Sequence, residues 1–518
     1  MFRAYRNIAR LTTVARTLAR HGALAPFTQQ IEGAGLAPLI VLAARLFSRG
    51  AKEAGRPGER LARALIDLGP VFIKLGQLLS TRSDILGQAV AEDLALLQDR
   101  LPPFPGAEAR AVLESELGQP FEALFRSFDE TPVSAASIAQ VHYAVTDEGA
   151  EVAVKVLRPG IEEAFARDLD LMVWIAEWIE RTQPRLRRFK PLAVVRTFHV
   201  MSRVEIDLRL EAAAAAELAA NFTDDPSYRV PRVDWRRTTQ RVLTLERLTG
   251  IRMDDRDGML AAGVDIDQVL ARAAAIFFKQ AFRDGFFHGD QHPGNMFVDG
   301  KGNIGAVDFG IMGRLDRKTR YYLADTLLGF LERNYGRVAE VQFAAGFVPA
   351  DRSLAEFTQA CRSIGEPIFG RPLAEISFAQ VLGQLLRLSE AFEMEAQPQL
   401  LLLQKNMLMA EGISRQLNPA LNIWTLALPL VEEWMRENRG PEAQIADAAR
   451  DLARMAGRLP ELLADLETAT ATIARRGVGL DPDIMATIRR INSEDRRWFN
   501  WHVWVAAALL ALVLLLGR

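Results

Sequence analysis

The stretch that most constrains this chain carries an acid, an amide and a second acid at fixed spacing. Asp290 is followed five residues later by Asn295, and Asp308 comes after two apolar runs, 296–298 and 304–307. These runs predict a hairpin that holds Asn295 and Asp308 at adjacent ends. In phosphoryl transfer of the kinase type, one carboxylate orients the attacking hydroxyl, while an amide oxygen and a second carboxylate hold magnesium. We predict such a site, with Asp290 as the base; a surface turn with helix-capping acids is the alternative.

A lysine within an apolar strand is the second feature. Segments 139–144 and 151–157 have the pattern of two strands around the turn 147–149, and Lys155 emerges from the second strand. Lysine is seldom buried without a partner. Kinases use such a lysine to hold the nucleotide phosphates and pair it with a glutamate on a nearby helix. A lysine at the edge of a strand is the alternative.

Three acids of one predicted helix, 192–221, are candidates for the partner of Lys155. These are Glu205, Asp207 and Glu211. Asp207 and Glu211 share a face, whereas Glu205 lies about 120° around an ideal helix from Glu211. The three carboxylates cannot reach one point on such a helix. We therefore assign Glu211 to Lys155, with Glu205 as the second choice and an ordinary solvated face as the alternative.

Two further segments complete the predicted nucleotide site. The small residues Ala135, Ala136 and Ser137 lie in a loop ahead of Lys155, where the sequence has no Gly-x-Gly-x-x-Gly motif. The strand that begins at Val242 leads into a connector. There, in a two-lobed kinase, we expect backbone groups around Glu246 and Leu248 to meet the adenine.

Two polar residues stand out in the apolar segment 71–80. Lys74 and Gln77 are three residues apart and share one helix face. The pattern alone leaves open whether this face is a solvent edge or a functional surface.

Composition limits the class of protein. The chain of 518 residues is 49% hydrophobic and has a net charge of -2, so it can bury a large core, and we expect no nucleic-acid partner. Its single cysteine, Cys361, excludes an internal disulfide and a cysteine-based zinc cluster.

Both ends of the chain predict membrane contact. Residues 1–31 hold five arginines and no acid. They fit a transit peptide or, as we favour, a basic helix on an anionic membrane surface. A helix from Trp498 to Leu516 reaches about 28 Å, close to the thickness of the bilayer core. Arginines precede this segment, which places the soluble body in the cytoplasm; they are Arg489, Arg490, Arg496 and Arg497.

Taken together, these motifs resemble the UbiB family of atypical kinases, also called the ADCK or coenzyme-Q kinase-like family. The resemblance covers residues 60–420 and is carried by 74–77, the alanine-rich loop 134–137 with 140–142, 205–207, and Asp290 with Asn295 and Asp308. One departure is Ser134, where the family often has alanine. The resemblance implies a protein-kinase-like fold, ATP and Mg²⁺ as cofactors, ATPase or unorthodox kinase activity, and support of ubiquinone biosynthesis at a membrane. It further implies that Lys74 and Gln77 cover the active site near Glu205 and Asp207, in a regulatory role.

The predicted fold is α+β, with two kinase-like lobes, an added N-terminal helical motif and a C-terminal transmembrane helix. Segment 397–409 predicts a buried helix, with the wall of a lipid pocket as the alternative. The expected domains are a basic amphipathic region (1–59), a helical Lys-x-Gly-Gln extension (60–120), an N-lobe (121–250), a C-lobe (251–420), a helical region (421–497) and a membrane anchor (498–517).

The expected function is a membrane-anchored atypical kinase or ATPase that supports ubiquinone biosynthesis. We expect the bacterial inner membrane, with the mitochondrial inner membrane as the alternative location. No Ala-Pro-Glu motif follows Asp308, so a small or lipidic substrate is favoured over a protein. The alternatives are a phosphotransferase that acts on a lipid or quinone precursor, and a nucleotide-binding scaffold for quinone-synthesis enzymes. The expected partners are anionic membrane lipids, quinone-biosynthesis enzymes or prenylated precursors, and a second copy of the chain.

Overall fold

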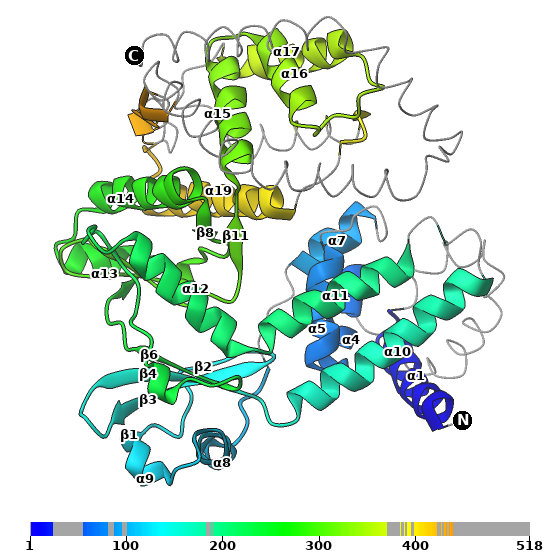
Figure 1. Cartoon of the computed structure of the whole chain (residues 1–518), viewed down its shortest axis with the longest axis vertical. Helices are drawn as coiled ribbons and strands as arrows, with labels where there is room; N and C mark the ends of the chain where they lie inside the picture. Colours follow the sequence, from blue (N-terminus) through cyan, green and yellow to red (C-terminus); the bar gives the residue numbers. More distant parts are fainter. Residues whose placement is uncertain are drawn as a thin grey trace, which may run out of the picture. The chain divides into compact units, whose positions relative to one another are not determined.

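The computed structural model describes residues 2–23, 55–80, 87–95, 101–182, 190–369 and 398–421, with isolated positions elsewhere up to residue 438. Residues Met1–Trp434 form one compact unit. It contains an antiparallel sheet in the order β1-β3-β4-β6, with β2 paired to β3 (Figure 1). The strands are β1 (Phe125–Phe128), β2 (Ser134–Ala135), β3 (Ala139–Thr146), β4 (Glu151–Leu157) and β6 (Val242–Glu246).

The alternation of side chains along β4 decides where Lys155 lies. Val152, Val154 and Val156 are buried on one face, in a cluster with residues of helices α8 (Gly106–Leu117) and α9 (Phe121–Leu124). Successive side chains of a strand point to opposite faces, so Lys155 lies on the other face. β4 pairs antiparallel with β3 on one side and β6 on the other. The predicted hairpin is present, and it is central in the sheet.

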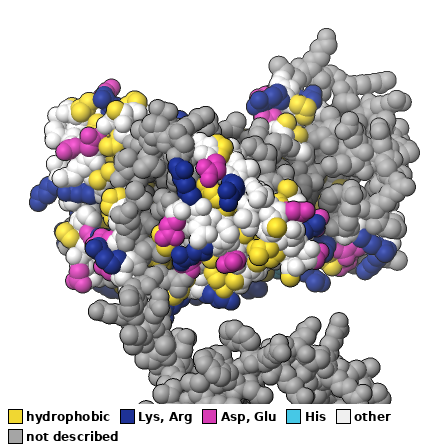
Figure 2. Space-filling model, turned by 90° about the horizontal axis from the view of Figure 1, so that it is seen from above, with side chains coloured by type: hydrophobic (Ala, Val, Ile, Leu, Met, Phe, Trp, Pro, Cys, Tyr) yellow, Lys and Arg dark blue, Asp and Glu magenta, His cyan; other side chains and the backbone are white. Residues whose placement is uncertain are grey.

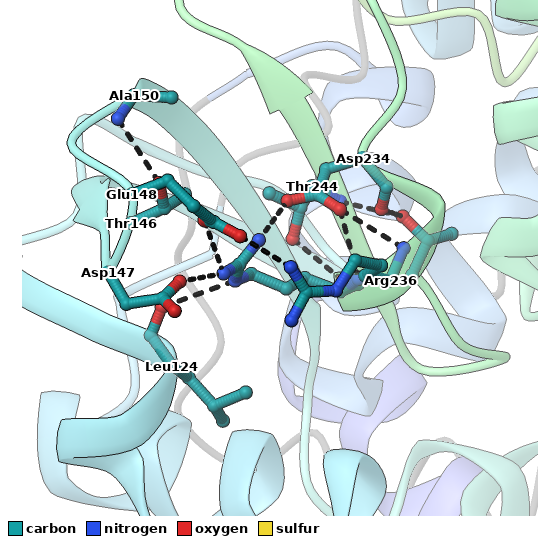
Figure 3. A network of polar contacts seen from close by, with 10 residues as sticks. Leu124, Thr146, Asp147, Glu148, Ala150, Asp234, Arg236 and Thr244 are labelled. Atoms are coloured by element: carbon teal, nitrogen blue, oxygen red, sulfur yellow. Dashed lines mark hydrogen bonds and ion pairs between the residues drawn. The ribbon is translucent and has the colours of Figure 1, made fainter.

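A buried arginine ties the β3–β4 turn to the segment before β6. Arg237 is 3% exposed. Its guanidinium contacts the carboxylates of Asp147, Glu148 and Asp234. The hydroxyl of Thr244 on β6 donates to the Arg237 carbonyl at 2.7 Å. Figure 3 shows the carboxylates of the turn, Asp147 and Glu148, together with Asp234 from the segment before β6 and Thr244 from β6. The network fixes the end of the hairpin that carries Lys155.

A group of helices packs together beside the sheet (Figure 1). Helix α1 contacts α4 and α10, and α5 contacts α4, α7, α10 and α11. The bounds are α1 (Phe2–Arg20), α4 (Pro57–Leu68), α5 (Pro70–Ser80), α7 (Gln88–Ala95), α10 (Ile161–Thr182) and α11 (Pro191–Glu205).

The arginines of α1 face acids of α10. Arg3 and Arg6 pair with Asp170 at 2.8 and 2.7 Å, and Arg10 pairs with the buried Asp168 at 2.7 Å. Three of the five arginines that predict a transit peptide or a membrane-surface helix are therefore engaged within the protein. The sequence pattern could not reveal this, because the acids come from a distant helix. Residues 24–54 of the predicted N-terminal region lie outside the described residues.

The prediction of one helix over 192–221 is wrong. Helix α11 ends at Glu205, and a separate helix, α12 (Leu208–Asn221), follows. Asp207 is the N-cap of α12; its side chain accepts from the backbone N–H of Arg209 at 3.2 Å. The N–H of Leu208 donates to the Gln240 carbonyl at 2.9 Å and so leaves the helical pattern. The capping preference of Asp competes with continuation of the helix.

Short strands and helices build the second lobe. The order of one sheet is β5-β10-β9-β7, and β11 pairs with β8. The hairpin predicted for 296–298 and 304–307 is present as β9 and β10, which pair antiparallel. The strands are β5 (Tyr228–Arg229), β7 (Ile251–Arg252), β8 (Phe286–His288), β9 (Met296–Val298), β10 (Ile304–Ala306) and β11 (Met312–Arg314).

Helices make up most of the rest of this lobe. Helix α14 continues into a π-helix at Lys279–Asp284. The described part of the predicted segment 397–409, residues 398–409, lies in α19, which is partly buried. The helices are α13 (Arg256–Ala261), α14 (Ile266–Phe278), α15 (Arg317–Leu331), α16 (Tyr335–Ala344), α17 (Leu354–Phe369) and α19 (Pro398–Leu417).

Charge of both signs is present on the described face that Figure 2 draws. On the face drawn in Figure 2, basic and acidic side chains are interspersed, as a net charge of -2 leads one to expect. Within the part of the chain that the structure describes, no helix is both long and apolar enough to cross a membrane. The predicted anchor (498–517) and most of the region 421–497 lie outside that part. The predicted domain boundaries stay predictions.

The substitution R237M is expected to destabilise the protein by about 3 kcal/mol, because it removes a buried cation and leaves three carboxylates facing one another. Urea unfolding followed by circular dichroism measures this. The matched control is R236M, because Arg236 is largely exposed and pairs only at the surface with Glu148. Equal stability of the two variants would show that the buried network does not hold the lobe.

Candidate active site

Three charged side chains from distant segments meet at the centre of the candidate site. The Lys155 ammonium donates to both carboxylate oxygens of Glu211 at 2.9 Å. It also donates to Oδ1 of Asp308 at 3.1 Å. Lys155 comes from β4, Glu211 from the first turn of α12 and Asp308 from the segment after β10. The structure thus brings Glu211, the first choice, to Lys155.

Burial and charge act in opposite directions in this cluster. Burial disfavours the charged form of Lys155, but the carboxylates of Asp308 and Glu211 outweigh it and raise its pKa. The Lys155 ammonium in turn lowers the pKa of Asp308 to about 2. Burial raises the pKa of Glu211, and Lys155 partly offsets this effect. Lys155 is therefore a fixed cation at neutral pH.

Asp308 has an unusual backbone conformation. Its φ is +65°, in the left-handed region that non-glycine residues seldom adopt. The following side chain, Phe309, is fully buried and packs edge-on against His288 at a ring-centroid distance of 5.6 Å. Asp308 itself remains half exposed. The buried phenylalanine thus anchors the segment while the carboxylate stays accessible to a ligand.

His288 organises the loop that carries Asp290. The side chain is 1% exposed. Its Nδ1 accepts from the Asp290 backbone N–H at 3.1 Å, and Nε2 lies 3.2 Å from the Val307 carbonyl oxygen. These contacts fit a neutral imidazole with the proton on Nε2. Burial lowers the pKa of His288 accordingly. The neutral ring links the Asp290 loop to the segment before Asp308.

The loop also needs glycine at position 289. Its N–H donates to the Ile311 carbonyl at 2.8 Å. A Cβ at Gly289 would lie 3.0 Å from the carbonyl oxygen and 2.8 Å from Cγ2 of Ile311. A side chain there would push apart β8 and β11, two strands that the sequence patterns did not predict.

The side chains of Asn295 and Asp308 fit a magnesium ion. The Val307 N–H donates to the Asn295 carbonyl at 2.9 Å, so the two segments run side by side. The Asn295 amide nitrogen donates to the Asp290 carbonyl at 3.3 Å, which leaves its Oδ1 for a cation. Among the described residues, no three His, Cys, Asp or Glu side chains cluster as metal ligands. Magnesium needs only one or two such ligands when phosphates supply the rest.

The break between α11 and α12 sends the acids to different partners. Glu205 pairs with Lys74 of α5 at 3.1 Å. Asp207 caps α12 and pairs with Arg209 at 2.7 Å, so it does not share a face with Glu211. The positive charge of Lys74 also contributes to the low pKa of Asp308. Gln77 is half-buried one turn further along α5. Of the predicted regulatory residues, Lys74 therefore acts on the charged cluster through its charge.

The alanine-rich loop is a tight turn at the edge of the sheet. The Ala136 N–H donates to the Ala139 carbonyl at 2.8 Å. Arg158 donates to the Ala136 carbonyl at 3.1 Å from Nε and 2.8 Å from Nη2. Ala135 lies in β2 and pairs with Gln140, and Ser137 is fully buried. This turn leads into the first residues of β3, which pair with the residues of β4 that follow Lys155.

The connector after β6 differs from the prediction in the contacts of Glu246. The Glu246 carboxylate binds Arg229 and Arg232, and its backbone N–H donates to the Arg232 carbonyl at 2.8 Å. These groups are thus engaged within the protein and are not available to an adenine. Leu248 packs beside Gly305 of β10, where its Cδ1 fills the space that a Cβ would need.

Sequence reasoning missed two site residues on α19. Lys405 pairs with Asp290, with 2.7 Å between Nζ and Oδ1. Asn406 is 1% exposed; its amide donates to the His288 carbonyl at 2.6 Å and accepts from the Gln291 N–H at 3.1 Å. The available signal was a polar triplet, 404–406, between apolar runs of the same helix.

Comparisons with known proteins decide the family. Residues 96–342 match the model of the ABC1 atypical kinase-like domain, and residues 361–422 match the UbiB helical domain. A protein from Marinobacter nauticus named "Probable protein kinase UbiB" is 41% identical over 464 residues, which cover 88% of this chain and 85% of that protein. The chain belongs to the UbiB family. A Vibrio vulnificus protein of the same name is 45% identical over 417 residues, covering 79% and 76% of the two chains.

A solved structure supports the fold. Rv3197 from Mycobacterium tuberculosis, determined in complex with erythromycin, aligns with a TM-score of 0.51 and 26% identity over 75% of this chain and 97% of its own. The family resemblance drawn from the motifs is confirmed, and so is a kinase-like fold of mixed helix and sheet. The roles assigned to single site residues stay predictions.

The substitution H288N tests the neutral imidazole. At neutral pH it should lower the free energy of unfolding by about 2 kcal/mol, through the loss of a buried hydrogen bond and of packing. Below about pH 6.5, His288 binds a proton more readily in the unfolded wild type than in the folded wild type. The free energy of unfolding of the wild type therefore falls, and its difference from that of H288N becomes smaller. Urea unfolding across this range measures the gap. The variant H199N, at an exposed position of α11, controls for loss of an imidazole as such; a gap independent of pH would contradict the assignment.

Proposed function

We propose that this UbiB-family chain is an atypical kinase-like enzyme that uses ATP and Mg²⁺. The single observation that carries the proposal is the contact of Lys155 with both Glu211 and Asp308. In protein kinases, a strand lysine paired with a helix glutamate holds the nucleotide phosphates, and the aspartate of Asp-Phe-Gly holds Mg²⁺ beside them. Asp290 and Asn295 on the adjoining loop supply the remaining polar groups.

Each residue has a role that follows from its surroundings. Lys155 holds the phosphates, and Glu211 keeps its ammonium in place. Asn295 and Asp308 hold magnesium, which when bound neutralises charge on the phosphates. Asp290 accepts the proton of the attacking hydroxyl or orients a water molecule. The alanine-rich turn at Ala135, Ala136 and Ser137 borders the nucleotide, and the backbone beyond Glu246, at Leu248, lies near the adenine. Lys74 and Gln77, with Glu205 and Asp207, regulate access.

The proposed physiological role is support of ubiquinone biosynthesis, based on membership of the UbiB family. The Met312–Arg314 strand leads from the Asp308 segment almost directly into α15, which leaves little chain for binding a peptide substrate. We favour ATP hydrolysis or phosphorylation of a small or lipidic acceptor. A phosphotransferase acting on a lipid or quinone precursor is the second candidate. A nucleotide-binding scaffold for quinone-synthesis enzymes is the third.

We further propose attachment to the bacterial inner membrane, with the soluble body in the cytoplasm. The apolar segment 498–517, led by tryptophans and preceded by arginines, supports a single anchor, and the similar relatives named above are bacterial. Anionic lipids, quinone-biosynthesis enzymes or prenylated precursors, and a second copy of the chain are the proposed partners.

The substitution D290N should lower ATP turnover at least about 100-fold while nucleotide binding is kept, because a proton acceptor is lost but no phosphate contact. Turnover is measured by phosphate release from protein lacking residues 498–518, with and without anionic liposomes. We expect liposomes to raise wild-type turnover.

The matched control for this experiment is D257N, an exposed acid of α13, which should behave as wild type. Wild-type turnover in D290N would remove Asp290 as the catalytic acid. Magnesium-dependent nucleotide binding without turnover in any protein would favour the scaffold.

The proposed role in ubiquinone biosynthesis predicts a metabolic defect. Cells that lack the gene should lose ubiquinone and accumulate early prenylated precursors, because a step after prenylation is not supported. Expression of the wild-type chain should restore ubiquinone, whereas D290N should not, and quinone extraction with mass spectrometry measures both. Normal ubiquinone in the deletion strain would refute this role, whatever the chain does with ATP.

A further inference from the structure

Helix α19 supplies a cation to the acid that is proposed to do the chemistry. Nζ of Lys405 lies 2.7 Å from Oδ1 of Asp290. The Lys405 side chain is about half exposed, at 48%. It is therefore close enough to bind Asp290 and open enough to meet a ligand beside it.

The position of Lys405 is set by its neighbour in the helix. Asn406 is buried and binds the Asp290 loop on both sides, through the His288 carbonyl and the Gln291 N–H. Two such hydrogen bonds from one buried amide fix the helix to the loop in a single register. Asn406 is accordingly a positioning residue, and it places Lys405 next to Asp290.

Apolar packing reinforces this contact. Leu403 of α19 is buried in a cluster with Phe287, Ala281 and Leu315. Phe287 lies in β8, directly before His288, so the strand that leads into the loop packs on the helix. The Lys405–Asp290 contact thus rests on a packed interface and two buried hydrogen bonds.

The proposed reaction requires positive charge near the transferred phosphoryl group, and Lys405 supplies a second cation beside Asp290. Negative charge on the transferred phosphoryl group must be matched by positive groups that are already in place. Lys155 is held by Glu211 and Asp308, and Lys74 pairs with Glu205. Lys405 lies instead beside the acid that orients the attacking oxygen.

We propose that Lys405 is a further catalytic residue: it holds the Asp290 carboxylate and stabilises negative charge on the phosphoryl group during transfer. The proposal rests on the proposed function. It joins the two matched regions chemically, because α19 lies within the UbiB helical domain and Asp290 within the ABC1 domain.

An acceptor oxygen, from a hydroxyl group or water, forms a bond to the γ-phosphorus of ATP. The bond from that phosphorus to the bridging oxygen breaks, and ADP leaves with the electron pair. The acceptor proton passes to Asp290 and then to solvent, while Lys405 keeps its protons throughout.

The test compares K405M and K405R with wild type in the full chain. In K405M, kcat for ATP should fall about 10- to 100-fold with KM changed less than about two-fold, because the missing charge acts on the transition state. K405R should recover most of the rate. Binding of Mg·ADP with aluminium fluoride, which mimics the transferred phosphoryl group, should weaken about 10-fold or more in K405M, while binding of Mg·ADP alone stays unchanged. The variant K301M, in the turn between β9 and β10, is the matched control.

Each outcome decides a different point. Wild-type kcat and wild-type affinity for the fluoride complex in K405M would overturn the role of Lys405, even if D290N abolishes turnover and the proposed function stands. Equal weakening of Mg·ADP with and without aluminium fluoride would show a structural role only and also overturn it. If wild type shows no turnover that depends on Asp290, the proposed function fails, and the two binding measurements still decide whether Lys405 recognises a phosphoryl group.

Discussion

The contact of the Lys155 ammonium with Glu211 and Asp308 is the interaction on which the rest of the structure depends. It joins the central strand of the sheet, the first turn of α12 and the segment after β10. A buried cation is costly unless opposite charges surround it. Each of the three segments therefore needs the other two, and their arrangement fixes the charged cluster at which we propose that phosphates bind.

The break between α11 and α12 determines which lysine each of two glutamates contacts. Because Asp207 caps a new helix, Glu205 and Glu211 point to different lysines, Lys74 and Lys155. The N-terminal helices are thereby linked to the charged cluster through an ion pair of their own. A continuous helix would have directed only one of these acids into the site.

The Asp290 loop is held in place partly by a residue that is distant in the sequence. His288 binds the loop from within, and Asn406 holds it from α19, 118 residues further along the chain. Helix α19, which lies in the region that matches the UbiB helical domain, thus contributes to the candidate active site. Its hydrogen bonds are buried, so they determine loop position more strongly than a surface contact would.

The sequence by itself determined what depends on local order: the β3–β4 and β9–β10 hairpins, the spacing of Asp290, Asn295 and Asp308, and the motifs that carry the family resemblance. Strand alternation and turn chemistry act over a few residues, so a pattern can reveal them. Only the tertiary structure decided the helix break, the pairing of the α1 arginines with α10 and the approach of Lys405 to Asp290. Those outcomes depend on partners far along the chain, such as the Gln240 carbonyl that receives the Leu208 N–H. No local pattern encodes the position of such a partner, because packing brings it there.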